Sequence, residues 1–197
     1  MRIVSITFLF ALFSLVVFPQ RFDAGFLLGM AATQVDGDGH GGFDKAGAIA
    51  GIWVSSKFKS AGFVRTEFRY IQKGSYAKTS TTTFYRMRLN YFELPVIVGY
   101  RFNNGFNGFV GLSPGYLARA NEMDESDTDY SESESRFKKY EFSGLFGVEY
   151  NYSERWKIGA LFCYSLIPVR PHPGSLTYRL NYGQYNQVVE LVIRYVL

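Results

Sequence analysis

Hydrophobic and polar residues alternate with a period of two along most of the chain. The last segment is the clearest case, because Glu190 and Arg194 share one face of a predicted strand. The opposite face is apolar and consists of Val189, Leu191, Ile193, Tyr195 and Leu197. A two-residue period over this length indicates a β-strand with two chemically different faces. Eight segments share the pattern: about 22–32, 45–55, 60–72, 85–101, 106–119, 137–151, 155–167 and 186–197.

The connections between these segments alternate in length. Those after the second, fourth and sixth segments are tight, with the sequences SSKFK, FNNGF and NYSER. Those after the first, third, fifth and seventh are long and polar, at about 33–44, 73–84, 120–136 and 168–185. Short turns at one end and long loops at the other are typical of bacterial outer-membrane barrels. The pattern predicts an all-β fold, an eight-stranded antiparallel transmembrane β-barrel with short periplasmic turns and long extracellular loops.

One strand distinguishes this barrel from a soluble, lipocalin-like barrel, which would keep its apolar face inside. The stretch YFELPVIVGYRF holds Glu93 and Pro95 among apolar residues. If Glu93 points into a polar lumen, the apolar residues from Phe92 to Tyr100 face outward, over the roughly 9–11 residues that a tilted strand needs to cross a bilayer. The two aromatic residues then mark the membrane boundaries. Pro95 lacks an N–H, so we expect a bulge or a local gap in the ladder there.

The N-terminal segment 1–20 differs from the rest. Arg2 is followed by a nearly unbroken apolar run to Phe18, which predicts a secretory signal peptide cleaved near Gln20. A membrane anchor is the alternative, but the run is short for a helical span. The remaining residues, 21–197, form the predicted barrel domain, which we place in the outer membrane of a Gram-negative bacterium.

Composition agrees with a two-faced barrel. Aromatic residues make up 18% of the chain, yet the mean hydropathy is only −0.05. Cys163 is the single cysteine, which excludes an intrachain disulfide and a thiolate metal cluster.

Charged residues on the predicted inner face form the first candidate site. Alternation places nine of them in the lumen: Arg65, Glu67, Arg69, Glu93, Glu141, Glu149, Lys157, Glu190 and Arg194. Because the bore of an eight-stranded barrel is just wide enough for side chains to fill, we interpret this set as a salt-bridge plug. A narrow ion path is the alternative.

Basic residues near the long loops form the second candidate site. They are Lys73, Lys78, Arg86, Arg88, Arg119, Arg136, Lys138, Lys139, Arg170 and Arg179. We interpret four of them as a lipid-phosphate rim, namely Arg86, Arg88, Lys138 and Lys139, because guanidinium groups suit phosphate and the outer leaflet carries anionic glycolipid. An exported membrane protein has no routine contact with nucleic acid, so we expect none to bind.

The loops offer weaker chemistry. The fifth connection holds the acidic sequence NEMDESDTDYSESES, which is typical of a solvated segment, although weak cation binding or a basic partner are alternatives. The first connection carries Asp36, Asp38 and Asp44, but Gly47 stands where a calcium loop would need its glutamate. His172 and Ser175 offer a hydrolase pair with no third partner. We therefore expect no enzyme, no cofactor and no metal.

Several segments resemble a known family. They are FRYIQKGS, NYFELPVIVGYRF, GFVGLSPGY and FSGLFGVEY, and together they are similar to the PorT-like outer-membrane β-barrel proteins of Bacteroidota-type bacteria. The family motifs fall on Glu67, Tyr70, Lys73 and Gly74; on Tyr91, Glu93, Leu94 and Pro95; on Gly108, Gly111 and Leu112; and on Gly144, Gly147, Glu149 and Tyr150. The chain departs from the family pattern at Val148, where a glycine is usual. The resemblance implies a porin-like, eight-stranded barrel of the cell envelope.

The expected role is structural or loop-mediated binding, with passive solute transport or a lipid-modifying enzyme as alternatives. The expected partners are outer-membrane lipid and lipopolysaccharide, the barrel-assembly machinery, and an extracellular or envelope protein. The last strand ends on Leu197 with Tyr195 before it, which is similar to an assembly signal of outer-membrane barrels. We expect a monomer.

Overall fold

The computed structural model describes residues 22–39, 41–58, 61–78, 84–123, 137–171 and 183–197. The predicted signal peptide lies outside this set. The described residues form strands and no helix, so none of their segments is a helix long and apolar enough to cross a bilayer. The strands are β1 (Phe22–Asp36), β2 (Lys45–Phe58), β3 (Gly62–Lys78), β4 (Phe84–Glu93), β5 (Val96–Arg101), β6 (Phe106–Met123), β7 (Tyr140–Asn151), β8 (Trp156–Ser165) and β9 (Tyr185–Val196).

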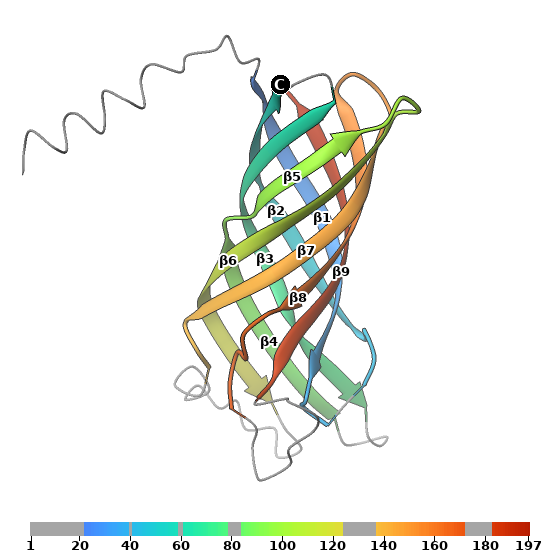
Figure 1. The fold of residues 1–197 in the computed structure, drawn as a ribbon. Coiled ribbons are helices and arrows are strands. Elements are labelled where there is room, and N and C mark those ends of the chain that lie inside the picture. The colour runs from blue at the N-terminus through green and yellow to red at the C-terminus, as the bar shows by residue number, and fades with distance from the viewer. Residues whose placement is uncertain (1–21, 40, 59–60, 79–83, 124–136, 172–182) are drawn as a thin grey trace, which may run out of the picture.

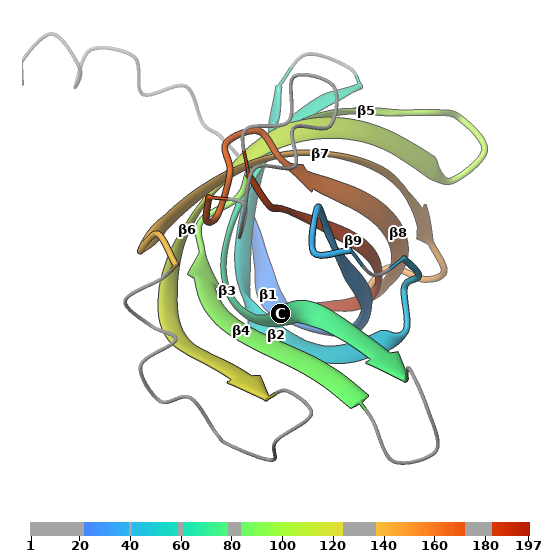
Figure 2. The same ribbon diagram turned by 90° about the horizontal axis from the view of Figure 1, so that it is seen from below.

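The strands close into one antiparallel ring (Figures 1 and 2). Strand β1 pairs with both β2 and β9, which joins the two ends of the sheet. Strands β4 and β5 both lie between β3 and β6, one after the other, so they are two parts of a single spanning strand. The ring therefore has eight strands, and the predicted fold is confirmed.

The interruption between β4 and β5 lies at Pro95, where a gap or bulge was expected. The Glu67 N–H donates to the Pro95 carbonyl at 3.1 Å, and the Leu94 N–H donates to the Pro114 carbonyl at 2.9 Å, so the chain continues without a change of register. Two reciprocal bonds are missing here, since neither Pro95 nor Pro114 has an N–H to donate back to the carbonyls of Glu67 and Leu94. The result is the local gap, not a bulge.

A true bulge lies elsewhere, in β6. Asn90 pairs with Arg119, but the next residue, Tyr91, pairs with Leu117, so Ala118 is an extra residue. Ala118 and Arg119 consequently both face outward, and the inward phase resumes at Ala120. This bulge moves Arg119 to the outer surface, where strict alternation would have turned it into the lumen.

Apolar side chains cover the outside of the ring, as the alternation predicts. Phe68, Val98 and Tyr100 are 49%, 49% and 56% exposed. The Phe68 and Phe92 rings stack on this surface with centroids 5.9 Å apart. An exposed belt of this size suits lipid, because large apolar patches on a protein normally face a partner or a membrane.

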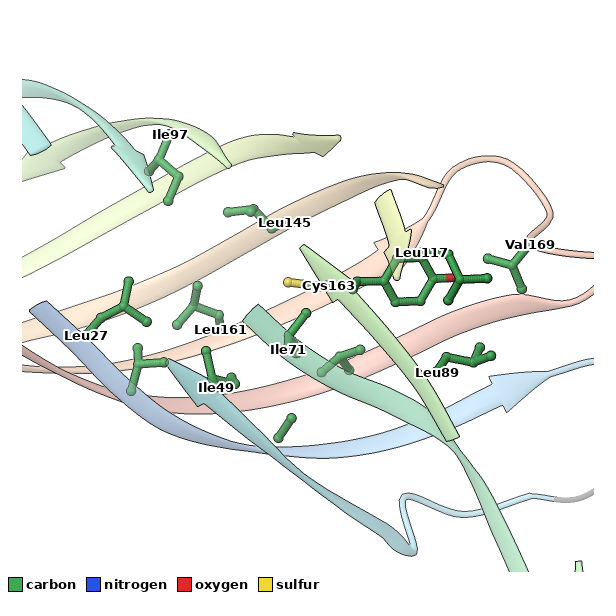
Figure 3. Packing of buried hydrophobic residues seen from close by; sticks show 14 of the residues in the cluster. Leu27, Ile49, Ile71, Leu89, Ile97, Leu117, Leu145, Leu161, Cys163 and Val169 are labelled. Carbon is green, nitrogen blue, oxygen red and sulfur yellow. The ribbon is translucent and has the colours of Figure 1, made fainter. Parts of the chain in front are cut away.

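The lumen is filled by side chains from every strand of the ring. Part of the filling is apolar: Leu27, Ile49, Ile71, Ile97, Leu145 and Leu161 point inward from different strands (Figure 3). A small barrel has room for little more than these side chains.

The two ends of the barrel differ, and we name them by their connections. The turn end holds the tight connections at residues 102–105 and 152–155, and the C-terminus lies there (Figure 1). The loop end holds the connections between β1 and β2 and between β8 and β9. Strands β1, β3 and β6 extend farther toward the loop end than predicted, and residues 73–78 of the loop expected at 73–84 are strand.

Candidate functional site

Strand β3 supplies most of the positive charge in the lumen. Arg65, Arg69 and Lys73 all have odd numbers, so they share the inward face of β3 with Glu67. Each of these four residues is 1% exposed. Lys73 was predicted at the basic rim, and the structure corrects this placement. Its odd number, in phase with Arg69, was the sequence signal that would have assigned it to the lumen.

Arg69 is the centre of the charged network. Its guanidinium donates to Glu93 from Nε at 2.9 Å and from Nη2 at 2.7 Å. It also donates to Glu190 from Nη1 at 2.7 Å and from Nη2 at 2.9 Å. Since Glu93 comes from β4 and Glu190 from β9, this one side chain ties together strands that are not neighbours in the ring.

The network continues toward the turn end. Arg194 of β9 donates to Glu67 of β3 at 2.8 Å and to Glu149 of β7 at 2.9 Å. Arg65 donates to the same Glu149 oxygen at 2.8 Å. None of these bonds joins adjacent strands, because β8 lies between β7 and β9, and two strands of the ring separate β3 from each of them; the bonds therefore span the lumen.

Toward the loop end, the network passes through Lys73. The Lys73 ammonium lies 2.6 Å from Glu93 and 2.8 Å from Glu141. Glu141 also accepts hydrogen bonds from Ser143, Ser165 and Asn186. Every one of these partners is buried, so both oxygens of the carboxylate have polar partners in place of water.

Lys157 and Cys163 have separate positions in the lumen. Lys157 lies near the turn end with its ammonium 5.2 Å from the centroid of the Trp53 ring. No ion pair joins it to a carboxylate among the described residues, in contrast to the other eight predicted lumenal charges. Cys163 is buried, and its thiol donates to Glu190 at 3.1 Å.

A second, smaller cluster closes the lumen at the loop end. Arg170 donates to Glu122 from Nη1 at 2.7 Å and from Nη2 at 2.9 Å, and its guanidinium lies 4.6 Å from the Phe137 ring. Burial alone would lower the pKa of Arg170, but the hydrogen bonds and charge of Glu122 raise it above its ordinary value. Burial, followed by Glu122, raises the pKa of Tyr85. Arg170 was predicted at the basic rim, and the structure places it inside.

The four predicted rim residues Arg86, Arg88, Lys138 and Lys139 are all exposed. Arg86 and Arg88 lie on the outer face of β4, and the bulge in β6 adds Arg119 beside them, since Arg119 pairs with Asn90. The positive charges of Arg88 and Arg86 affect the pKa of Lys45, which lies at the loop end of β2. Burial, followed by repulsion from Arg88 and then Arg86, lowers the pKa of Lys45 to about 8.

The remaining sequence predictions concern the loops. His172 and Ser175 lie outside the described residues, as does most of the acidic fifth connection. Glu122, which was counted with that connection, is instead part of β6 and binds Arg170. No group of three or more potential metal ligands lies together in the described part of the chain.

Comparison with known proteins identifies the family. The sequence pattern described as "Outer membrane protein beta-barrel domain" matches residues 17–170, well over half of the chain. The chain belongs to this outer-membrane β-barrel family. It is therefore an outer-membrane protein of a Gram-negative bacterium, as its two-faced strands indicate.

Solved structures of similar fold agree with this family. One is the crystal structure of Ail, the attachment invasion locus protein of Yersinia pestis, in complex with the heparin analogue sucrose octasulfate. Ail is 14% identical to this chain, with a TM-score of 0.52, and the match covers 90% of this chain and 99% of that chain. Another is neisserial surface protein A, which is 11% identical, with a TM-score of 0.56 over 88% and 97% of the two chains. At such identities the likeness concerns the fold. No curated protein sequence matches the chain.

Proposed function

We propose that this outer-membrane barrel is closed and acts through its outer surface, in a structural or binding role. The observation that carries the proposal is the ion-pair network across the bore. Glu67, Glu93, Glu149 and Glu190 come from four different strands and are all joined through Arg69, Arg65 or Arg194. An ion that entered the bore would have to displace buried ion pairs, which costs several kcal/mol for each pair that is broken.

Conductance of the folded protein in a planar bilayer tests the closed lumen. We expect no ion-conducting steps from the wild-type barrel. The matched variant replaces Arg69, Lys73, Glu93 and Glu190 by alanine, which removes two charges of each sign and should produce measurable steps. Steps of similar size from the wild-type protein would contradict the proposal and favour the alternative, a passive small-solute porin.

We also propose that the exposed basic residues bind phosphate groups of outer-leaflet lipopolysaccharide. Arg86, Arg88 and Arg119 lie on the adjacent strands β4 and β6, and Lys138 and Lys139 are exposed just before β7. Arginine presents a planar fork of donors that matches phosphate oxygens. Burial is the main cause of the lowered pKa of Lys45, and the added repulsion from Arg88 and Arg86 supports a positive field on this side of the barrel.

Binding of lipopolysaccharide to the barrel in nanodiscs tests this rim. The variant with Arg86, Arg88 and Arg119 all changed to Gln should bind several-fold more weakly, while Arg155→Gln at the turn end should bind as the wild type does. Because the structure of Ail contains a heparin analogue, heparin serves as the second arm. Tighter binding of heparin than of lipopolysaccharide would contradict a lipid role.

We infer no catalytic role, and the PorT-like assignment is part of the same proposal. The buried carboxylates of the lumen are held in ion pairs, and the Glu93-Leu94-Pro95 motif supports the assignment by its place in a spanning strand. We expect assembly by the barrel-assembly machinery and a monomeric protein. Release of labelled acyl chains from lipopolysaccharide by the purified protein would contradict the non-enzymatic role.

A further inference from the structure

Acidic and basic residues are sorted between the two faces of the wall built from β3, β4, β6 and β7. The carboxylates of these four strands are all buried in the lumen, namely Glu67, Glu93, Glu122, Glu141 and Glu149. The outer face carries the exposed residues Arg86 and Arg88 on β4 and Arg119 on β6. Within these strands, the outer face therefore has positive charge and no carboxylate.

The three outward arginines are not neutralised by the protein. Neither Arg86 nor Arg88 forms a hydrogen bond or an ion pair with any residue that the structure describes. Arg119 donates from Nε to the side-chain oxygen of Asn121 at 3.0 Å, and it forms no ion pair in the described part of the chain. Because all three side chains are exposed, an anion can reach them from outside the barrel.

The register of β4 and β6 brings two of these arginines together. Asn121 lies directly opposite Arg88, and opposite side chains on one face of a sheet have Cβ atoms about 4.5–5.5 Å apart. Since Asn121 holds the Arg119 guanidinium, the Arg119 side chain leans along β6 toward Arg88. On its other side Arg88 pairs with Gly74, which has no side chain to compete for the space. We call Arg88 and Arg119 the arginine pair.

A row of outward-facing aromatic side chains gives the depth of the arginine pair in the membrane. The row is paired in register across β3, β4, β6 and β7 and consists of Tyr70, Phe92, Tyr116 and Tyr140. Aromatic rows of this kind mark the boundary of the hydrocarbon. Arg88 lies on the same face of β4 as Phe92, four residues closer to the loop end. At about 3.4 Å per residue and a tilt of about 40°, it is roughly 10 Å above the row, beyond the hydrocarbon and beside the lipid headgroups.

We propose that the arginine pair binds one phosphate group of an outer-leaflet glycolipid directly, without a bridging divalent cation. The inference rests on the proposed binding of lipopolysaccharide at the rim, and it names the two residues and the type of contact. A guanidinium presents a planar fork of donors that can bind two phosphate oxygens at once. Magnesium and calcium require oxygen ligands such as carboxylates, which the outer face of these strands lacks, and the two guanidinium charges would repel a cation.

Binding of lipid A, the phosphorylated glycolipid anchor of lipopolysaccharide, to the full folded chain in nanodiscs of zwitterionic phospholipid tests the arginine pair. Binding is measured with and without EDTA, and the same lipid without its phosphates is the reference. We expect equal binding of lipid A with and without EDTA. The double variant Arg88→Lys, Arg119→Lys keeps both charges but loses both planar forks, so it should bind at least fivefold more weakly. Arg86→Lys is the matched control on the same face of β4 and should bind as the wild type does.

The possible failures separate this inference from the proposed function. Loss of wild-type binding in EDTA would show a cation bridge and would overturn direct contact while leaving the rim in place. Wild-type affinity in the double variant, or an equal weakening by Arg86→Lys, would show attraction by net charge and would overturn the assignment to the arginine pair. Equal binding of lipid A with and without its phosphates would overturn the rim and the arginine pair together. Circular dichroism checks that each variant is folded.

Discussion

Replacement of Arg69 by methionine is the sharpest test of the lumenal network. Methionine keeps much of the length of the side chain but removes four hydrogen bonds to two carboxylates. Glu93 would still have Lys73 at 2.6 Å, whereas the thiol of Cys163 would be the one partner left to Glu190 among the residues that the structure describes. Glu190 is 0% exposed, so the variant leaves a buried carboxylate without a cation.

The expected loss in the free energy of unfolding follows from the unpaired, buried charge of Glu190. Removing one partner of a buried ion pair costs about 3–5 kcal/mol, because the remaining charge keeps its desolvation penalty. We expect the free energy of unfolding to fall by about that amount in Arg69→Met. The double variant Arg69→Met, Glu190→Gln removes the stranded charge as well, so it should recover about 2 kcal/mol of the loss.

Urea unfolding in phospholipid vesicles measures these differences by tryptophan fluorescence. Trp53 is 1% exposed and reports the lumen, and Trp156 is 47% exposed and reports the lipid side. Arg88→Met is the matched control, since Arg88 is exposed on the outer face and should leave unfolding unchanged. A loss below about 1 kcal/mol in Arg69→Met, or a double variant no more stable than the single one, would refute the reasoning.

Three further predictions concern other parts of the barrel. Lys45 should titrate near pH 8 when its side chain is followed by NMR, and Arg88→Gln should raise that pKa. Because the pKa in the folded barrel lies below the unfolded value of 10.5, the free energy of unfolding should rise between about pH 8 and 10.5. A pKa of 10.5 for Lys45 in the folded barrel would contradict this prediction. Gly74→Ala should lower the midpoint of urea unfolding, because Gly74 has a φ of 132° and an added Cβ would lie 2.1 Å from a backbone oxygen. Gly41→Ala is the control and should leave the midpoint unchanged, because the space around Gly41 is open. Equal midpoints for the two variants would contradict the predicted backbone strain at Gly74. Cys163 should react with maleimide only after unfolding, and rapid labelling of the folded protein would show an open lumen.

The sequence determined the two faces of the strands and hence the fold class. Alternation is a local property, since successive side chains of any strand point to opposite sides, and it placed Arg69, Glu93 and Glu190 in one lumen without knowledge of their neighbours. It was insufficient for Arg119, because one extra residue at Ala118 reversed the phase, and no local feature of the sequence marks that bulge.

Only the tertiary structure decided which charges meet. Arg170 and Glu122 are 48 positions apart, and Arg69 and Glu190 are 121 apart, so their contacts depend on how the ring closes and on the stagger between its strands. Lys157 points into the lumen as Arg65 does. In the closed ring, however, Arg65 donates to Glu149, whereas Lys157 lies beside a cavity. The physical reason is that the inward direction of a side chain is set by its own strand, whereas its partner is set by the register of all eight.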